Sequence, residues 1–293
     1  MSGQLKEVRN RIQSVTSTQQ ITKAMKMVSA AKLRRAQDSI LQMRPYAQKL
    51  QEMLSNIVSS VSADMDMPLA EERAAERVLL IPITSDRGLC GAYNANVIKL
   101  TRQRIAEQYA AQNSKGNVTL LPIGKKGYDY FVRHGFKVVD EFWRIFSDLA
   151  FENVRRAALY AQQAFLDKTY DRVELVYSQF RNAATQVFVV EPYLPVPRVT
   201  GEDNRNTDFI FEPSREVLVR ELMPKILNTQ VYKAVLDANA SEHGARMTAM
   251  DKASENANEL LRSLKISYNR ARQAAITTEL TEIVSGAAAL KGQ

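Results

Sequence analysis

The chain has 293 residues, of which 45% are hydrophobic and 25% charged, and its formal net charge is +8 at pH 7. This composition is typical of a globular protein, and no stretch approaches the roughly 20 apolar residues that span a bilayer. A single cysteine, Cys90, excludes an internal disulfide, and two histidines are too few for a His-rich metal site. The first twelve residues contain no apolar signal core, so we expect no export. Because no complete cofactor-binding motif is present either, we expect no cofactor.

The positive charge is concentrated near the amino terminus. Residues 1–50 hold ten lysines and arginines against Glu7 and Asp38, whereas the rest of the chain carries thirty charges of each sign. Such a basic stripe can face nucleic acid, anionic lipid or an acidic protein partner, or it can simply be the solvated face of a helix.

The first segment is predicted to be one long helix over residues 4–61. It contains no glycine, and Pro45 is expected to kink it near residues 41–45. At 1.5 Å per residue it would extend about 85 Å. The polar run at 16–20 interrupts the apolar register, which resumes at Ile21. The predicted seam is Leu5, Val8, Ile12, Val15, Ile21, Met25, Val28, Leu33, Ala36, Ile40, Leu50, Leu54, Ile57 and Val61.

The middle segment has a different sequence pattern, in which short apolar runs alternate with stretches of helical periodicity. This alternation predicts an α/β layer with a largely parallel sheet, and the five-residue link before the last run predicts an antiparallel hairpin at one edge. The predicted strands are 77–86, 117–124, 136–142, 172–180 and 186–194, and the predicted helices are 93–112, 125–135 and 147–167.

The last segment, from Ser214 to about Leu290, again has a helical pattern throughout. At 1.5 Å per residue it would extend about 110 Å, far longer than an ordinary globular helix. Steps of three and four predict the seam Met250, Ala253, Ala257, Leu260, Leu264, Ser267, Ala271 and Ala274.

Two helices of this length cannot bury their seams on one α/β domain, so we expect them to pair with each other in an antiparallel coiled coil. The fold class is therefore a long antiparallel coiled coil of the terminal helices plus a central Rossmann-like α/β domain. The expected division is 1–62, 74–208 and 209–293, and the longer final helix should extend beyond its partner.

Patterns for catalysis are weak. The "GLCG" turn at 88–91 and "IGKKG" at 123–127 resemble parts of phosphate-binding loops, but neither is complete, and ordinary strand-to-helix turns explain both. Asp86 and Arg87 favour capping and ion-pair roles, and Cys90 has no nearby histidine to activate it. We therefore expect no catalytic site in this chain.

The chain ends carry a specific resemblance. The stretch "ITTELTEIVSGAAA" at 276–289 resembles the carboxyl-terminal signature of the gamma subunits of F-type ATP synthases. The stretches at 11–37, "RPYA" at 44–47 and "SDRGLCGAYN" at 85–94 are similar to the same family, and the likeness covers the whole chain. The resemblance implies a rotary shaft inside a hexamer of alternating alpha and beta subunits, with the α/β domain below, beside the epsilon subunit and the membrane ring of c subunits.

The resemblance also implies roles for individual residues. It places an acidic loop of the beta subunits against the basic stripe, a polar collar against the beta and alpha loops, and a smooth bearing at the carboxyl-terminal tip. The implied beta and alpha contacts are Lys23, Met25, Lys26, Arg246, Arg272, Gln273, Thr277, Glu279 and Glu282. The implied bearing tip is Ile283, Val284, Gly286, Ala287 and Leu290, and candidate contacts to the ring or epsilon are Arg34, Arg35, Arg44 and Asp208, with the loop from Glu202 to Glu212.

The chain differs from some members of that family in two features. The family's chloroplast forms carry an inserted cysteine pair, which a chain with one cysteine cannot form, and no organellar targeting segment is seen. We therefore expect a bacterial, peripheral protein at the cytoplasmic face of the plasma membrane, without a nucleotide site or nucleic acid partner. The alternatives are a coiled-coil protein that binds nucleic acid through residues 1–50, and a nucleotide-using α/β enzyme.

Overall fold

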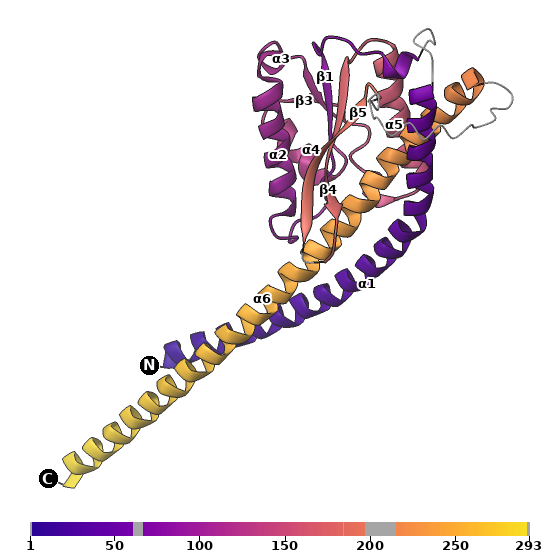
Figure 1. The fold of residues 1–293 in the computed structure, drawn as a ribbon. Helices are drawn as coiled ribbons and strands as arrows, with labels where there is room; N and C mark the ends of the chain where they lie inside the picture. Colours follow the sequence, from indigo (N-terminus) through magenta and orange to yellow (C-terminus); the bar gives the residue numbers. More distant parts are fainter. Residues whose placement is uncertain (1, 61–66, 184, 197–214, 292–293) are drawn as a thin grey trace. The chain divides into compact units, whose positions relative to one another are not determined.

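The computed structural model describes residues 2–60, 67–183, 185–196 and 215–291. Two long helices bracket the chain: α1 spans Ser2–Ser60 and α6 spans Arg215–Lys291 (Figure 1). Both continue through an internal proline, Pro45 in α1 and Pro224 in α6. The predicted long terminal helices are confirmed.

The middle of the chain forms a five-stranded sheet with the strand order β3-β2-β1-β4-β5. The first four strands run parallel, and β5 pairs antiparallel with β4 at the edge, as the short link predicted. The strands are β1 (Val78–Pro82), β2 (Val118–Leu120), β3 (Lys137–Val138), β4 (Arg172–Phe180) and β5 (Gln186–Leu194).

Short helices connect these strands. They are α2 (Tyr93–Gln108), α3 (Ala110–Ser114), α4 (Lys125–Arg133) and α5 (Phe151–Leu166), with 3-10 turns at Pro68–Ala70 and Ile145–Ser147. The predicted helix at 93–112 is two helices, because α2 ends where Tyr109 leaves the helical conformation, with φ −126°. The buried Tyr109 ring packs beneath the sheet instead.

Alternating side chains of β1 divide the core between the two faces of the sheet. Leu79 and Ile81 join a cluster with α5 and with the part of α6 around Leu227 and Val235. Val78 and Leu80 pack on the other face with Ile105 of α2 and Phe131 of α4. Because both faces are covered, every residue of β1 is buried, as in parallel sheets generally.

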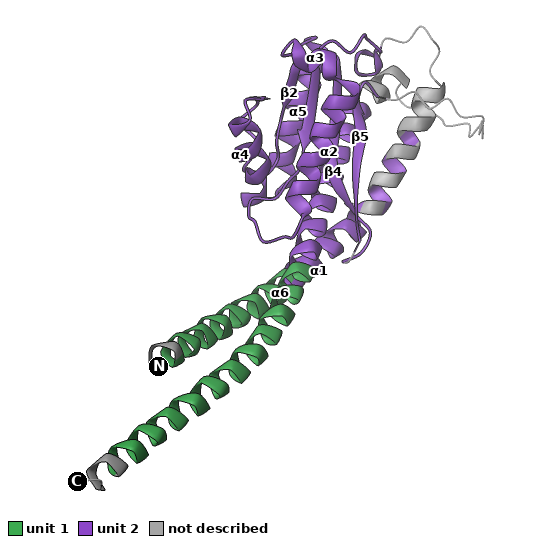
Figure 2. Ribbon diagram, turned by 90° about the vertical axis from the view of Figure 1, so that its left-hand side faces the viewer, with its two compact units in different colours: residues 1–29, 247–293 green, residues 30–246 purple. Residues whose placement is uncertain are grey.

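The chain divides into two compact units. One unit consists of residues 1–29 and 247–293, and the other of residues 30–246 (Figure 2). The first unit is the pair of terminal helices, and the second is the α/β domain with the adjoining stretches of α1 and α6. The three-segment division expected from the sequence stays a prediction.

Candidate functional site: the paired terminal helices and the loop at residues 85–91

The terminal helices pair antiparallel within the first unit. Arg9 Nη2 donates to the hydroxyl of Tyr268 at 3.2 Å, the hydroxyls of Thr22 and Ser254 are 2.7 Å apart, and Lys26 Nζ lies 2.5 Å from Asp251 Oδ1. As the residue number rises along α1, it falls along α6, which is the antiparallel arrangement that the sequence predicted.

The seam of α1 differs from the predicted one. Ile21 and Val28 are 59% and 57% exposed, whereas Thr22 and Ser29 are buried. The register therefore continues through the polar run at 16–20 without interruption. Its buried or half-buried positions are Leu5, Val8, Ile12, Val15, Gln19, Thr22, Lys26, Ser29, Leu33, Ala36 and Ile40, in strictly alternating steps of three and four.

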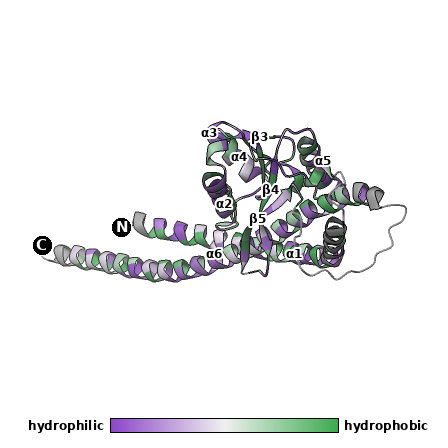
Figure 3. Ribbon diagram, turned by 45° about the horizontal axis from the view of Figure 1, so that its top comes forward, coloured by the Kyte–Doolittle hydropathy of each residue, from purple (hydrophilic) through white to green (hydrophobic). Residues whose placement is uncertain are grey.

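The observed seam of α6 also differs from the predicted one. Leu260 is 43% exposed, and Ser267 and Ala274 are exposed too, so these three predicted seam positions are wrong. Met250, Ala257, Leu264 and Ala271 do face inward, but the positions between them are one residue further along. The observed seam is Met250, Ser254, Ala257, Leu261, Leu264, Tyr268, Ala271, Ala275 and Thr278. Figure 3 shows hydrophilic and hydrophobic residues interleaved along this part of α6.

The polar seam residues explain why an apolar pattern missed them. Each hydroxyl also bonds a carbonyl of its own helix: Thr22 donates to Gln19 O at 3.0 Å, and Ser254 donates to Met250 O at 2.8 Å. A buried hydroxyl with partners of this kind carries little desolvation cost. A count of heptads that ignored polarity would have found Thr22 and Ser254.

Most of the predicted beta and alpha contacts lie on the solvent-facing sides of the paired helices. Lys23 on α1 is exposed, while Lys26 is ion-paired to Asp251 and Met25 is half-buried. On α6, Arg272, Gln273, Thr277, Glu279 and Glu282 are all exposed. Exposure leaves these side chains accessible to a partner chain.

A groove of about 780 Å³ runs between the helices near the chain ends. Leu5, Lys6, Arg9 and Asn10 of α1 line one side, and Ala275, Thr278, Glu279 and Glu282 of α6 line the other. The groove thus brings Glu279 and Glu282, two of the predicted contacts, beside basic side chains of α1.

The predicted tip is a largely exposed apolar surface. Ile283 and Val284 are 67% and 66% exposed, and Gly286 and Ala287 are exposed as well. The side chain of Leu290 lies outside the described residues. Of the predicted ring or epsilon contacts, Arg34 and Arg35 are exposed on α1. The described part of the structure does not include the side chain of Arg44. It also does not include Asp208 or the Glu202–Glu212 loop.

Arg246 lies in a different environment from the rest of the predicted collar. It belongs to the second unit, and its guanidinium bonds the carbonyl oxygens of Gly88 and Arg87 and the carboxylate of Glu242. Burial alone would raise the pKa of Glu242, but the neighbouring His243 and Arg246 lower it below its ordinary value. Arg246 therefore holds the loop at 85–91 within its own domain.

In the stretch 123–127, which resembles part of a phosphate-binding loop, the backbone N–H groups of residues 125–127 already donate to groups of the protein itself. At the start of α4, the Lys125 amide donates to Asp86 Oδ1 at 3.0 Å, the Lys126 amide to Ser85 O at 3.0 Å, and the Gly127 amide to Thr84 Oγ1 at 2.8 Å. These are the donors that a phosphate would need at a helix amino terminus. Among the described residues, no group of three or more His, Cys, Asp or Glu side chains is placed to hold a metal ion.

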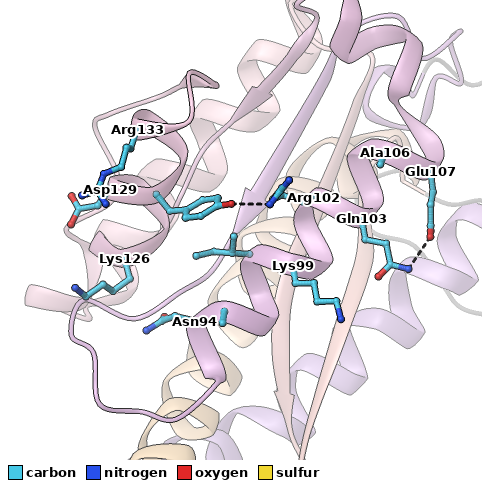
Figure 4. A pocket seen from close by; sticks show the side chains of 12 residues that line it. Asn94, Lys99, Arg102, Gln103, Ala106, Glu107, Lys126, Asp129 and Arg133 are labelled. Carbon is cyan, nitrogen blue, oxygen red and sulfur yellow. Dashed lines mark hydrogen bonds between the residues drawn. The ribbon is translucent and has the colours of Figure 1, made fainter.

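A second groove, of about 830 Å³, lies between α2 and α4 (Figure 4). Arg102 Nη1 donates to the hydroxyl of Tyr130 across it at 3.1 Å, and Ile98 is among the residues that line it. Four basic residues line the groove against two acidic ones; the basic residues are Lys99, Arg102, Lys126 and Arg133, and the acidic ones are Glu107 and Asp129. Its net positive charge favours an acidic partner.

These features define a class of protein: an α/β domain inserted between two long helices that pair antiparallel and leave an apolar tip exposed. Within the part of the chain that the structure describes, no helix is both long enough and apolar enough to cross a membrane.

Comparison with known proteins identifies the family. A family model described as ATP synthase matches residues 4–290. The ATP synthase gamma chain of Cytophaga hutchinsonii is 52% identical over 98% of each chain, and that of Chlorobium phaeobacteroides strain BS1 is 50% identical over 99% of each. The chain belongs to the ATP synthase gamma-chain family.

Solved structures agree with this assignment. The chain is 28% identical to one in the central stalk and c-ring of the Tetrahymena thermophila mitochondrial ATP synthase, with a TM-score of 0.55, over 80% of this chain and 99% of that one. A chain of the Euglena gracilis mitochondrial ATP synthase has the same fold at 21% identity, with a TM-score of 0.67, over 99% of this chain and 95% of that one. Its homologues and structural neighbours are thus gamma and central-stalk rotor subunits of ATP synthases.

Proposed function

We propose that this chain is the central rotor shaft of a bacterial F-type ATP synthase, coupling proton-driven rotation of a membrane ring to ATP synthesis or hydrolysis in a hexamer of alpha and beta subunits. The observation that carries the proposal is the antiparallel pairing of α1 with α6, which leaves Ile283 and Val284 exposed at one end. Two packed helices resist twisting and bending better than one helix does, as a shaft requires.

The proposed contacts with the hexamer follow from charge and exposure. The basic surface of α1 at Lys23 suits an acidic loop of the beta subunits. The exposed polar side chains Arg272, Gln273, Thr277, Glu279 and Glu282 form a collar that can bond alpha and beta loops. The tip, from Ile283 through Leu290, serves as a bearing, since an uncharged surface turns inside a sleeve without ion pairs that fix one orientation.

The α/β domain is proposed to bind the epsilon subunit and the ring of c subunits. Arg34 and Arg35 offer exposed positive charge on α1, and the groove between α2 and α4 adds a second basic surface. We propose that the chain works at the cytoplasmic face of the plasma membrane, without a catalytic site of its own and without a direct nucleotide, since ATP chemistry would belong to the hexamer.

Reconstitution tests this proposal. The full chain is mixed with purified alpha and beta subunits, and assembly is followed by size-exclusion chromatography and by ATP hydrolysis. We expect a stable complex with ATPase activity, and we expect deletion of residues 276–293 to weaken assembly or coupling. ATP hydrolysis by the isolated chain, abolished by substitution of Gly88 or Lys125, would contradict the proposal.

A further inference from the structure

The groove between α2 and α4 has two helical walls on the same face of the sheet. These helices follow β1 and β2, which are parallel neighbours, and their buried side chains Ile105 and Phe131 join one cluster. The groove follows α2 from Asn94 to Glu107, a length of about 20 Å at 1.5 Å per residue. Its length therefore suits one further helix of about four turns that lies along α2.

The lining of this groove combines half-buried apolar side chains with short ones. Ile98 of α2 and Tyr130 of α4 are half-buried and pack against the cluster that covers the sheet. Ala95 and Ala106 of α2 are exposed, and neither has a side chain long enough to fill the space between the helices. An amphipathic helix can lay its apolar face on a lining of this kind.

The positive charge of the groove is not compensated by the chain itself. Its four basic side chains come from both helices (Figure 4) and are exposed, and none of them forms an ion pair within the part of the chain that the structure describes. Arg102 donates to the neutral hydroxyl of Tyr130, which leaves its charge unpaired. Glu107 accepts from the Gln103 amide at 2.8 Å. A partner that supplies carboxylates would therefore neutralise charge that is unpaired in the free chain.

We propose that the groove between α2 and α4 is a docking site for an acidic amphipathic helix of a partner chain. The apolar face of that helix lies over Ile98 and Tyr130, and its carboxylates pair with the four basic side chains of the groove. The inference deepens the proposed function, on which it rests for its biological role, because it gives the basic surface of the α/β domain a partner of defined chemistry.

The mixture of groups in the groove favours a helix over other anionic partners. Lys99 and Arg102 are three residues apart on α2, so carboxylates one turn apart on the docked helix can pair with both. A nucleic acid backbone carries a charge at every phosphate, and Glu107 and Asp129 would repel it. A bilayer surface is flat and would not reach the half-buried Ile98. An acidic helix, by contrast, uses the apolar and the basic groups together.

The first test measures binding of a synthetic peptide to the isolated full-length chain by fluorescence anisotropy. The probe is a fluorescein-labelled peptide of about 14 residues, with leucines at helical spacing on one face and glutamates on both flanks. We expect a dissociation constant on the order of 100 µM at low salt, and weaker binding as salt is added. A peptide of the same composition in scrambled order should bind about tenfold more weakly, because it cannot present the apolar and acidic faces together.

Charge reversal then locates the binding. Lys99→Glu combined with Arg133→Glu should weaken peptide binding about tenfold or more. The matched control is Lys115→Glu combined with Lys137→Glu, which makes the same change in net charge at exposed lysines outside the groove and should bind normally. Peptide addition should also slow amide hydrogen exchange in α2 and α4, while exchange in α5, on the opposite face of the sheet, stays unchanged. Unaltered exchange in β1 shows that both double variants are folded.

The outcomes separate the inference from the proposed function. Equal losses in the two double variants, or equal binding of the scrambled peptide, would show a general effect of charge and would overturn the inference. Absence of peptide binding would overturn it too, as would tighter binding of a DNA duplex or of phosphatidylglycerol vesicles at the same residues. None of these measurements uses the alpha and beta subunits. Failure of the chain to assemble with those subunits would therefore overturn the proposed function, while peptide binding would still decide whether the groove accepts an acidic helix.

Discussion

Single residues fix the turns of the α/β domain, and Gly124 is the most constrained of them. Its φ is 104°, and a Cβ there would lie 2.3 Å from the carbonyl oxygen of Thr84. We predict that Gly124→Ala destabilises the chain by about 3 kcal/mol or more, because backbone strain and a backbone clash combine. Thermal unfolding measures the loss.

Gly135 supplies the matched control for that prediction. Its φ is 74°, but a Cβ there would meet nothing within 4 Å. Gly135→Ala should therefore cost only the conformational strain, about 1–2 kcal/mol. Equal losses in the two variants would show that the contact with Thr84 has no energetic consequence.

Asp171 gives the domain a pH-dependent contribution to stability. Burial would raise its pKa, but hydrogen bonds and charge from Arg77, with the charge of Arg73, lower it below the ordinary value. Arg77 Nη2 lies 3.1 Å from Asp171 Oδ1. Because the folded pKa is lower than the unfolded one, this contribution is fully present above the ordinary pKa, about 3.9, and is lost as pH falls through the lowered folded value.

Asp171→Asn should destabilise the chain by about 2 kcal/mol near neutral pH, the size of a hydrogen bond to a charged group. The difference from the unsubstituted chain should shrink as pH falls below about 4. Urea unfolding from pH 3 to pH 7 measures both effects. Asp140→Asn, which changes an exposed carboxylate, is the control; the same pH dependence in this variant would contradict the assignment to Asp171.

At the scale of elements, the sequence predicted the strands and the long helices well. The two strands of the antiparallel hairpin, β4 and β5, begin and end where the sequence pattern placed them. The prediction worked there because both runs are rich in Val, Phe and Tyr, which favour strands. Burial itself does not alternate in β4, which is buried from Val173 to Ser178. The predicted strands at 77–86, 117–124 and 136–142 were too long, because β1, β2 and β3 span only Val78–Pro82, Val118–Leu120 and Lys137–Val138.

The seams of the coiled coil were only half predictable. Ala253 and Ser254 are both small, so hydropathy alone cannot decide which one faces the partner helix. Ile21 and Val28 are apolar but exposed in the single chain, because the hydrophobic pattern of α1 includes a second face as well as the seam. The contact of Arg246 with the 85–91 loop was not predictable either, since it joins residues about 160 positions apart.

The buried hydroxyl pair of Thr22 and Ser254 should contribute to the stability of the helix pairing. Thr22→Val alone should destabilise the pairing of α1 and α6 by about 1 kcal/mol, because Ser254 loses a buried partner. Thr22→Val combined with Ser254→Ala should restore most of the stability, since two apolar groups then face each other. Helix content against temperature, followed by circular dichroism, measures both variants. A double variant less stable than Thr22→Val would contradict the proposed role of the pair.

At the scale of the whole molecule, both long helices take part in both units, and the carboxyl-terminal helix α6 divides its roles between them. Residues up to Arg246 of α6 belong to the α/β unit, and residues from Met247 belong to the unit with the start of α1. In the first part, buried side chains such as Leu227 and Val235 join the core of the sheet. Beyond the seam, the side chains at 279–287 of α6 are exposed in the isolated chain. A continuous helix is therefore held at one end by its own domain and is available to other subunits at the other.

Because the carboxyl-terminal tip is exposed in the free chain, substitutions there should change assembly without changing the stability of the free chain. Because Ile283 and Val284 are 67% and 66% exposed, replacing both with glutamate removes little buried surface from the free chain. The unfolding temperature of the free chain should change by no more than about 2 °C, corresponding to about 0.5 kcal/mol for a surface change. Inside a hexamer the same carboxylates would be desolvated without partners, which is costly. Assembly with the alpha and beta subunits, measured by size-exclusion chromatography, should therefore fall markedly. Val132→Glu, which changes a residue 48% exposed on α4, should assemble normally, and equal assembly of the two variants would rule out an enclosed tip.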